Sequence, residues 1–288
     1  RSRGLGDVYK RQFKILCENK DGIPGGLRLS YATLGAFTKY PKGSVPLNPS
    51  SHIKDKKFGF FEPQNVFFQE VAEELGMKKS DNEFFRHPLA FLVEAADDIC
   101  YTLIDFEDGI NLGWINEEFA LEFLIRLVKG TIDTKKYNSL QHKSDRVAYL
   151  RALSVNTLIN DATEIFINNE EEILKGEFSK SLLEKSIYKA QMEDILNISV
   201  DKVYNSEEVI EKELKGYQVI NHLLNVFIKA TVNNQNDQMT AFDKLALECI
   251  PQSYIHKSGS LYIQLLDISC FIASLTDGKA LEWYEKVK

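Results

Sequence analysis

The chain has 288 residues, of which 44% are hydrophobic and 27% are charged, so it is long and apolar enough for one large core or two smaller ones. Its formal net charge of −7 argues against a dedicated nucleic-acid binder, which carries a clear basic face. No run approaches the roughly eighteen consecutive apolar residues of a membrane span, so no membrane partner is predicted.

Residues 1–12 differ from the sequence that follows them. The run SRGLGDVYKRQ (residues 2–12) resembles the translation of a transposase-type sequencing adapter. Segments of this kind are set aside before fold reasoning. We therefore expect residues 1–12 to be a non-native segment that packs against nothing. A natural basic arm is the alternative.

The remaining chain is predicted to be all-α. Apolar residues recur at helical spacing, alternating strand patterns are scarce, and no Walker or Rossmann phosphate loop is present. Residues 41–63 hold four of the seven prolines and are predicted to form an irregular loop. Helices are expected over residues 13–17, 29–38, 64–75, 86–108, 116–128, 140–168, 179–196, 206–230, 239–248, 261–274 and 276–285.

The helix expected over residues 86–108 has an unusual composition. It carries a proline in its first turn and is expected to end at Asp108-Gly109. Most of its positions are apolar, which is typical of a helix buried on nearly all sides. We therefore expect this helix to lie at the centre of the fold.

Four polar residues of this helix share one narrow stripe. Glu94, Asp97, Tyr101 and Asp105 fall together because positions one and two turns apart stack on one face. Burying ionised carboxylates is unfavourable unless a cation or hydrogen-bond donors compensate. An inward acidic stripe therefore indicates a cation, with a divalent metal as the natural one. A solvated ridge is the alternative.

These residues and several flanking motifs resemble a known family. The run RHPLAFLVEAADDICYTLIDFEDG (residues 86–109), together with GLRLSYATL (26–34), KYP (39–41) and KKFGFF (56–61), is similar to motifs of the bacterial deoxyguanosinetriphosphate triphosphohydrolases, within the HD phosphohydrolase superfamily. The resemblance covers nearly all of residues 13–288. It implies a multi-helix, HD-domain-like bundle.

The resemblance also implies roles for the stripe. Asp97 matches a metal ligand, Tyr101 a residue that lines the deoxyribose, and Asp105 one that hydrogen-bonds a sugar hydroxyl. The implied activity is hydrolysis of a dNTP, dGTP above all, to a deoxynucleoside and tripolyphosphate, with a divalent Mg or Mn ion as cofactor. A cytoplasmic homo-oligomer is expected, and the four cysteines, which lack CxxC spacing, fit reduced core thiols.

The other metal ligands of the family have no counterpart in this sequence. An early His and a His-Asp doublet are missing, because none of the five histidines precedes an aspartate. We therefore expect residues 13–288 to be the C-terminal majority of an N-terminally truncated enzyme, with the catalytic histidine outside it. Such a fragment is expected to be inactive and to bind metal poorly.

Alternative functions remain open. A helical interaction or scaffold module without catalysis would keep the same pattern of helices, and another HD enzyme that hydrolyses cyclic or alarmone nucleotides would keep the same motifs. Arg146 and Arg151 lie on the helix expected over residues 140–168 and could each bind a phosphate bidentately, although surface arginines are commoner. No recognisable motif indicates a preference for guanine.

Overall fold

The computed structural model describes residues 8–18, 26–45, 57–254 and 259–288. Within these ranges it contains thirteen α-helices and one two-stranded sheet, so the predicted all-α fold is confirmed. The described chain forms two compact units that divide after Ser206. The described chain therefore does not form one large core: the first unit contains two hydrophobic clusters and the second unit contains one.

The first unit contains nine α-helices and the small sheet among its described residues. Its α-helices are α1 (Val8–Cys17), α2 (Tyr31–Phe37), α3 (Asn65–Glu74), α4 (Ala90–Asn111), α5 (Glu117–Val128), α6 (Thr134–Ser139), α7 (Lys143–Asn168), α8 (Glu170–Leu174) and α9 (Lys189–Ser199). The 3-10 turns η2 (Glu62–Gln64) and η3 (Leu183–Lys185), the π-helical turn η4 (Val200–Tyr204) and the antiparallel pair β1 (Lys78–Ser80) and β2 (Glu83–Phe84) complete it.

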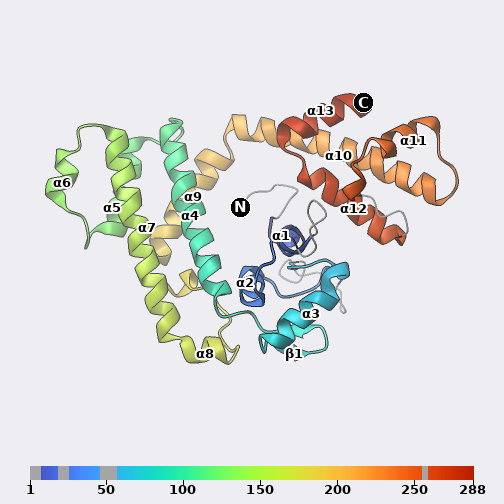
Figure 1. Ribbon diagram of the computed structural model, residues 1–288. Coiled ribbons are helices and arrows are strands. Elements are labelled where there is room, and N and C mark those ends of the chain that lie inside the picture. The colour runs from blue at the N-terminus through green and yellow to red at the C-terminus, as the bar shows by residue number, and fades with distance from the viewer. Residues whose placement is uncertain (1–7, 19–25, 46–56, 255–258) are drawn as a thin grey trace. The chain divides into compact units, whose positions relative to one another are not determined.

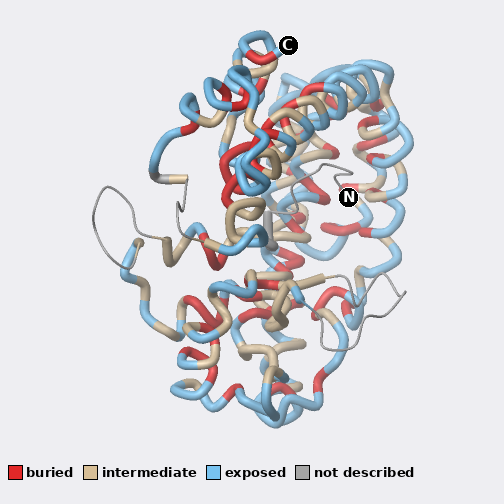
Figure 2. The backbone as a smooth tube through the Cα atoms, turned by 90° about the vertical axis from the view of Figure 1, so that its right-hand side faces the viewer, coloured by how far each residue is buried: buried red, intermediate tan, exposed pale blue. Residues whose placement is uncertain are grey.

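The main core of this unit lies among α4, α5, α7 and α9, which pack side by side (Figure 1). Leu103 and Phe106 of α4 are fully buried in it, as are Leu124 of α5 and Leu150 of α7. Buried and exposed residues alternate along these helices in the manner of amphipathic helices. Figure 2 shows the same alternation of buried and exposed positions on the helices that it presents. Helix α4 is therefore central to the packing of the first unit, although it is not buried on nearly all sides as expected.

A second, aromatic core joins the early helices of the first unit. Phe13 of α1, Phe68 of α3 and Phe60, which precedes η2, are almost completely buried. The rings of Phe60 and Phe68 stack with centroids 4.2 Å apart. Helix α1 begins at Val8, so residues 8–12 continue the helix that contains Phe13. Residues 1–7 of the segment assigned to an adapter lie outside the described residues, and its non-native origin stays a prediction.

The second unit is built on one long helix. It comprises α10 (Glu207–Gln235), α11 (Ala241–Glu248), the 3-10 turn η5 (Gln252–Tyr254), α12 (Leu261–Ser274) and α13 (Asp277–Val287). Its core contains an aromatic group from three helices, in which the ring of Phe271 lies 5.9 Å from Phe227 and 5.2 Å from Trp283. Thr240 and Asp243 form a capping box that starts α11.

The observed elements differ from the expected ones in several places. Helix α4 passes through Gly109 to Asn111, because Gly109 serves a close approach of neighbouring side chains rather than a helix end. The helix expected over 179–196 is divided into η3 and α9, and the β1–β2 hairpin was not expected at all. Gly76 follows the C-cap of α3 and terminates that helix as predicted, with a φ of 65° that favours glycine.

No helix among the described residues is long and apolar enough to cross a membrane.

Candidate functional site

Helix α4 carries the site, and its surroundings differ from the sequence-based expectation on one face. Asp97 and Asp105 are half-buried, whereas the side chain of Tyr101 is 57% exposed. The same face exposes Cys100 and Ile104, although the mostly apolar sequence of this helix predicted burial on nearly all sides. The helix is therefore buried on one side, and the stripe lies at the border between the core and the exposed face.

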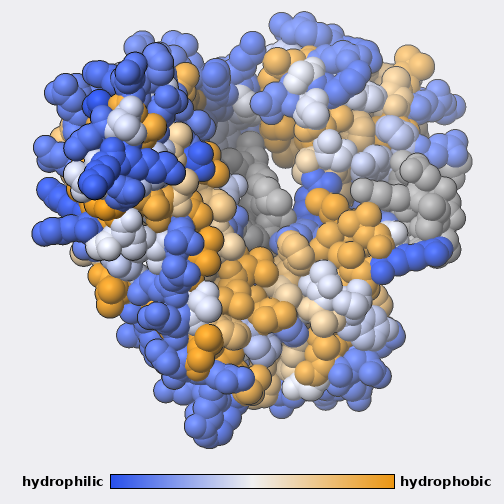
Figure 3. Space-filling model, turned by 60° about the vertical axis from the view of Figure 1, so that its left-hand side comes forward, coloured by the Kyte–Doolittle hydropathy of each residue, from blue (hydrophilic) through white to orange (hydrophobic). Residues whose placement is uncertain are grey.

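Apolar groups at this border are part of a wider pattern. Several large apolar side chains of the first unit are exposed, including Leu89 and Ile104 of the α4 segment. Figure 3 shows apolar residues at the surface of the face that it presents. Contiguous apolar patches, rather than single exposed apolar residues, are typical of surfaces that contact a ligand or another chain.

Glu94, at the N-terminal end of the stripe, has two cationic partners. Its Oε1 lies 3.3 Å from Nζ of Lys39, and its Oε2 lies 2.6 Å from Nη2 of Arg86. The same Arg86 nitrogen donates to the Ala90 carbonyl at 3.0 Å, and the guanidinium lies over the Phe91 ring at 4.2 Å. This cluster ties the chain after α2 and the chain before α4 to one carboxylate, so Glu94 is structural.

Asp97 and its neighbour Asp98 are in a less favourable electrostatic position. Burial raises the pKa of Asp97 above its ordinary value. Burial also raises the pKa of Asp98, and Lys39 opposes that rise. A raised carboxyl pKa means that the fold disfavours the ionised form, and a bound cation would favour it again. Asp97 is therefore suited to bind a positively charged group.

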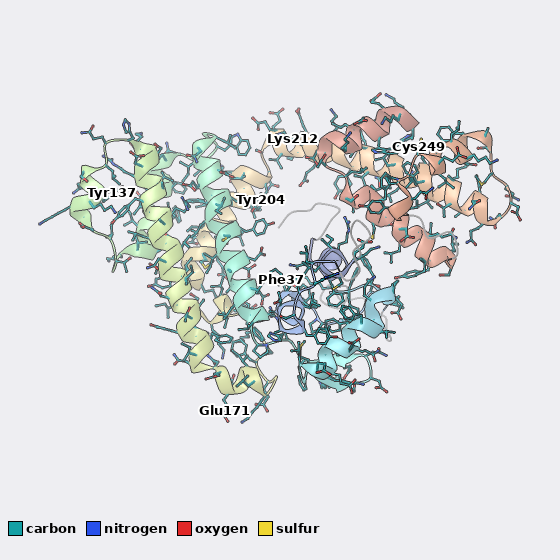
Figure 4. All side chains as sticks on the ribbon, viewed as in Figure 1. Phe37, Tyr137, Glu171, Tyr204, Lys212 and Cys249 are labelled. Atoms are coloured by element: carbon teal, nitrogen blue, oxygen red, sulfur yellow. The ribbon has the colours of Figure 1, made fainter. Side chains whose placement is uncertain are left out.

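Asp105, two turns beyond Asp97, has a neutral partner. The hydroxyl of Tyr204, the residue that Figure 4 labels beside α4, donates a hydrogen bond to its Oδ2. The pKa of Tyr204 is raised by burial first, then by this hydrogen bond and by the charge of Asp105, with a smaller contribution from Tyr101. Tyr101, Asp105 and Tyr204 therefore form one polar group at the C-terminal half of α4.

The described residues do not supply a complete metal site. No group of three or more His, Cys, Asp or Glu side chains that could hold an ion is found among them. His87 is a helix-start residue, whose Nδ1 accepts from the Leu89 amide at 3.2 Å, and His222 lies in the second unit. His52 and His256 lie outside the described residues. Asp97 alone does not fit a divalent ion, which takes several protein ligands.

The two arginines considered as phosphate ligands contact other groups. Nε of Arg151 lies 2.7 Å from Oε2 of Glu107 on α4, and Nε of Arg146 donates to the Leu140 carbonyl at 2.9 Å. Both contacts hold α7 to its neighbours in the first unit. Within the described residues, Arg151 has one anionic partner, Glu107, and Arg146 has none. Binding of a phosphate by either arginine stays a hypothesis.

Comparisons with known proteins identify the family. No protein-family model matches the chain. It is 31% identical over 272 residues to a deoxyguanosinetriphosphate triphosphohydrolase-like protein of Synechocystis, which covers 92% of this chain and 60% of that protein. A protein of the same name from Listeria monocytogenes is 30% identical over 293 residues, with 91% of this chain and 60% of that protein covered.

Over this shared region the chain belongs to the deoxyguanosinetriphosphate triphosphohydrolase family. A deoxyguanosinetriphosphate triphosphohydrolase of Yersinia pestis is also similar, at 30% identity over 252 residues, with 80% of this chain and 49% of that protein covered. The chain spans about 60% of the length of the first two relatives.

Sequence reasoning missed three residues of the site. Lys39 and Arg86, the partners of Glu94, lie in the KYP and RHPL motifs that carried the family resemblance, so a signal for them was present. Tyr204 lies 99 residues from Asp105 and stands in no such motif. No local pattern connects two side chains at that separation.

Proposed function

We propose that this chain supplies the sugar-facing side of a dNTP triphosphohydrolase, with dGTP as the preferred substrate. The reaction cleaves the bond between the 5′ oxygen of the sugar and the α-phosphorus, and it releases a deoxynucleoside and tripolyphosphate. The observation that carries the proposal is the face of α4 on which Asp97, Tyr101 and Asp105 follow one another. Family membership supports it.

Each of the three residues has a chemistry suited to one part of the substrate. The Asp97 carboxylate is an anionic oxygen donor for a divalent cation. The exposed Tyr101 ring offers a flat apolar surface to a sugar, and the carboxylate of Asp105 accepts a hydrogen bond from a hydroxyl. Tyr101 and Asp105 lie about 6 and 12 Å beyond Asp97 along the helix axis. That span suits a phosphate end and a sugar end of one nucleotide.

We further propose that Asp97 is one of several ligands of a Mg or Mn ion, and that residues 13–288 are the C-terminal part of a longer enzyme. The other ligands and the general acid or base would then come from outside this chain, so no proton transfer is assigned to it. The support is the coverage of about 60% of the relatives' length and the absence of a His-Asp doublet from the sequence. A cytoplasmic homo-oligomer is proposed on the resemblance alone.

The test uses the protein encoded by the complete reading frame that contains codons 13–288. It is incubated with each of the four dNTPs, with GTP, and with a cyclic and an alarmone nucleotide, in Mg²⁺ or Mn²⁺, and tripolyphosphate is measured. We expect release from dNTPs, fastest from dGTP. Hydrolysis of only the cyclic or alarmone nucleotide would favour another HD enzyme, and no hydrolysis at all would favour the scaffold.

A further inference from the structure

We propose that Tyr204 is a positioning residue that fixes Asp105 to read the 3′ hydroxyl of the deoxyribose. The proposal rests on the function proposed above. A 2′-deoxynucleoside triphosphate has one free sugar hydroxyl, because the 2′ position carries none and the 5′ oxygen carries the phosphates. A carboxylate that reads the sugar by a hydrogen bond therefore has the 3′ hydroxyl as its target.

The geometry gives the two oxygens of Asp105 different roles. The Tyr204 hydroxyl donates to Oδ2, and among the described residues no second donor to this carboxylate is found. An ionised carboxylate only accepts hydrogen bonds, and it has about four lone-pair sites on two oxygens. With Oδ2 held by the protein, Oδ1 keeps its capacity to accept a hydrogen bond from a ligand, and the hydrogen bond restrains rotation of the carboxylate.

The fold brings Tyr204 to Asp105 by an unusual local structure. Tyr204 ends η4, a π-helical turn that follows α9, and turns of this kind are rare and concentrate at functional sites. The hydroxyl of Ser199, the last residue of α9, donates to the Ile195 carbonyl at 3.1 Å, a contact that bends helices. The change from the α-helical pitch of α9 to the π-helical pitch of η4 determines the direction in which the Tyr204 side chain projects.

A close approach of η4 to α4 fixes this arrangement. A Cβ atom at Gly109, one turn after Asp105, would lie 2.6 Å from Cγ2 of Val203 and 2.7 Å from Cδ1 of Ile115. Only glycine leaves space for Val203 at this position. Val203 is buried there, and Tyr204 follows it directly in the chain. Gly109 therefore holds η4 close enough for the hydrogen bond to form.

The electrostatic environment keeps Tyr204 a donor. Any tyrosine hydroxyl is protonated at neutral pH, and because burial and the contact with Asp105 raise the pKa of Tyr204, its hydroxyl stays protonated in alkaline solution as well. A water molecule in the same place could donate too, but it would also exchange and reorient. The tyrosine hydroxyl is oriented before a substrate binds. Such preorganisation favours a well-defined hydrogen-bond geometry between Asp105 and the sugar hydroxyl.

The first experiment tests the pair in the chain itself. Tyrosine ionisation is followed by ultraviolet absorbance from pH 8 to pH 12 in the wild type, in Tyr204→Phe and in Asp105→Asn. Tyr31 is expected to ionise late in all three proteins, because its hydrogen bond to Glu70 raises its pKa. We expect a second late-ionising tyrosine in the wild type, which is absent from Tyr204→Phe and ionises earlier in Asp105→Asn. Titration of Tyr204 together with the exposed tyrosines, with no change in Asp105→Asn, would overturn the proposed pair.

The second experiment tests the role in the protein from the complete reading frame. The ratio of kcat/KM for dGTP to that for 2′,3′-dideoxyguanosine triphosphate is measured in the wild type, in Tyr204→Phe and in the control Tyr188→Phe, which removes a tyrosine hydroxyl elsewhere in the first unit. We expect Tyr204→Phe to lower the ratio about tenfold, the scale of one hydrogen bond, mainly through slower use of dGTP. Tyr188→Phe should leave it unchanged.

The outcomes separate the two proposals. An equal fall for both nucleotides, or no fall for either, would show that Tyr204 does not help to read the 3′ hydroxyl and would overturn the inference while the triphosphohydrolase activity stands. A wild-type protein that hydrolyses neither nucleotide would overturn the proposed function and this role with it. In that case the titration still decides whether the hydrogen bond exists.

Discussion

The two halves of α4 treat their carboxylates in opposite ways. In the N-terminal half, Glu94 is bound by two cations, Lys39 and Arg86, that come from other segments. In the C-terminal half, the partner of Asp105 is the neutral hydroxyl of Tyr204. The first arrangement compensates a largely buried charge completely, whereas the second orients a carboxylate and leaves its charge in place.

This difference separates structural from functional acids on one helix. An ion pair with little exposure is costly to open, so Glu94 is not available to a ligand. A carboxylate that meets a hydroxyl, or one such as Asp97 whose burial raises its pKa, retains the capacity to bind a cation or a donor. Side chains of one type in one stripe can therefore have different tasks, and their partners reveal which.

The largest expected loss of stability follows from opening the N-terminal cluster. Glu94→Ala leaves Lys39 and Arg86 without their carboxylate, and we expect the first unit to lose about 3 kcal/mol. Urea unfolding followed by circular dichroism measures it. Glu171→Ala, which removes one side of the exposed pair with Lys175, is the control and should change stability by less than about 0.5 kcal/mol. Equal effects of both variants would break the distinction between the two kinds of acid.

Gly109→Ala, in the C-terminal half of α4, is expected to lower the free energy of unfolding of the first unit by about 2 kcal/mol. Alanine is the better helix former by about 1 kcal/mol, but the clash with Val203 and Ile115 outweighs that gain. Gly216→Ala, in α10, meets no atom within 4 Å and should be stabilising. Thermal unfolding of both variants compares them. A stable Gly109→Ala protein that keeps the late ionisation of Tyr204 would show that the close approach is unnecessary.

Arg151→Ala should lower stability by about 1 kcal/mol, because its half-exposed contact with Glu107 joins α7 to the end of α4. The Arg151→Ala variant and the wild type are both made from the complete reading frame. Their denaturant midpoints are compared, and their dGTP turnover is measured in parallel. We expect turnover to change little beyond the stability effect. A large rise in KM for dGTP without a change in stability would instead assign Arg151 to the phosphates.

The smallest effect concerns cysteine reactivity, which reports the exposed face of α4. Cys100 is exposed, whereas burial raises the pKa of Cys17 to about 11. Since the thiolate is the reactive form, iodoacetamide should modify Cys100 rapidly at pH 8 and Cys17 only as the pH approaches 11, with a rate that rises about tenfold per pH unit. Mass spectrometry of timed samples measures both. Protection of Cys100 at pH 8 would mean that this face of α4 is covered.

Much of the fold was predictable because it follows from local patterns. Helical spacing of apolar residues identified α4 and the helices that pack on it, and Gly76 gave a correct end for the segment of α3. Gly109 was misread as an end because a glycine that permits close packing looks the same in sequence as one that stops a helix. The two-residue strand of the hairpin is too short to show a period.

The candidate site was predictable only along a single helix. The wheel aligned Asp97, Tyr101 and Asp105, but it could not show that Cys100 and Ile104 on the adjacent face are exposed, since exposure depends on which segments pack there. The partners of Glu94 and Asp105 come from tertiary structure. Tyr204 lies 99 residues from Asp105. Its position beside Asp105 depends on a π-helical turn and on the close approach of Val203 to Gly109, and neither feature has a local signature in the sequence.

The most direct test of a functional role for the face of α4 that carries Asp97, Tyr101 and Asp105 is Asp97→Ala in the protein from the complete reading frame. Tripolyphosphate release from dGTP and bound manganese are measured together, with Glu171→Ala as the control. The account predicts that Asp97→Ala loses both metal and more than about 100-fold in turnover, beyond the loss typical of a supporting contact, while the control keeps both. Full metal occupancy with near-normal turnover in Asp97→Ala would contradict it and make α4 a structural helix.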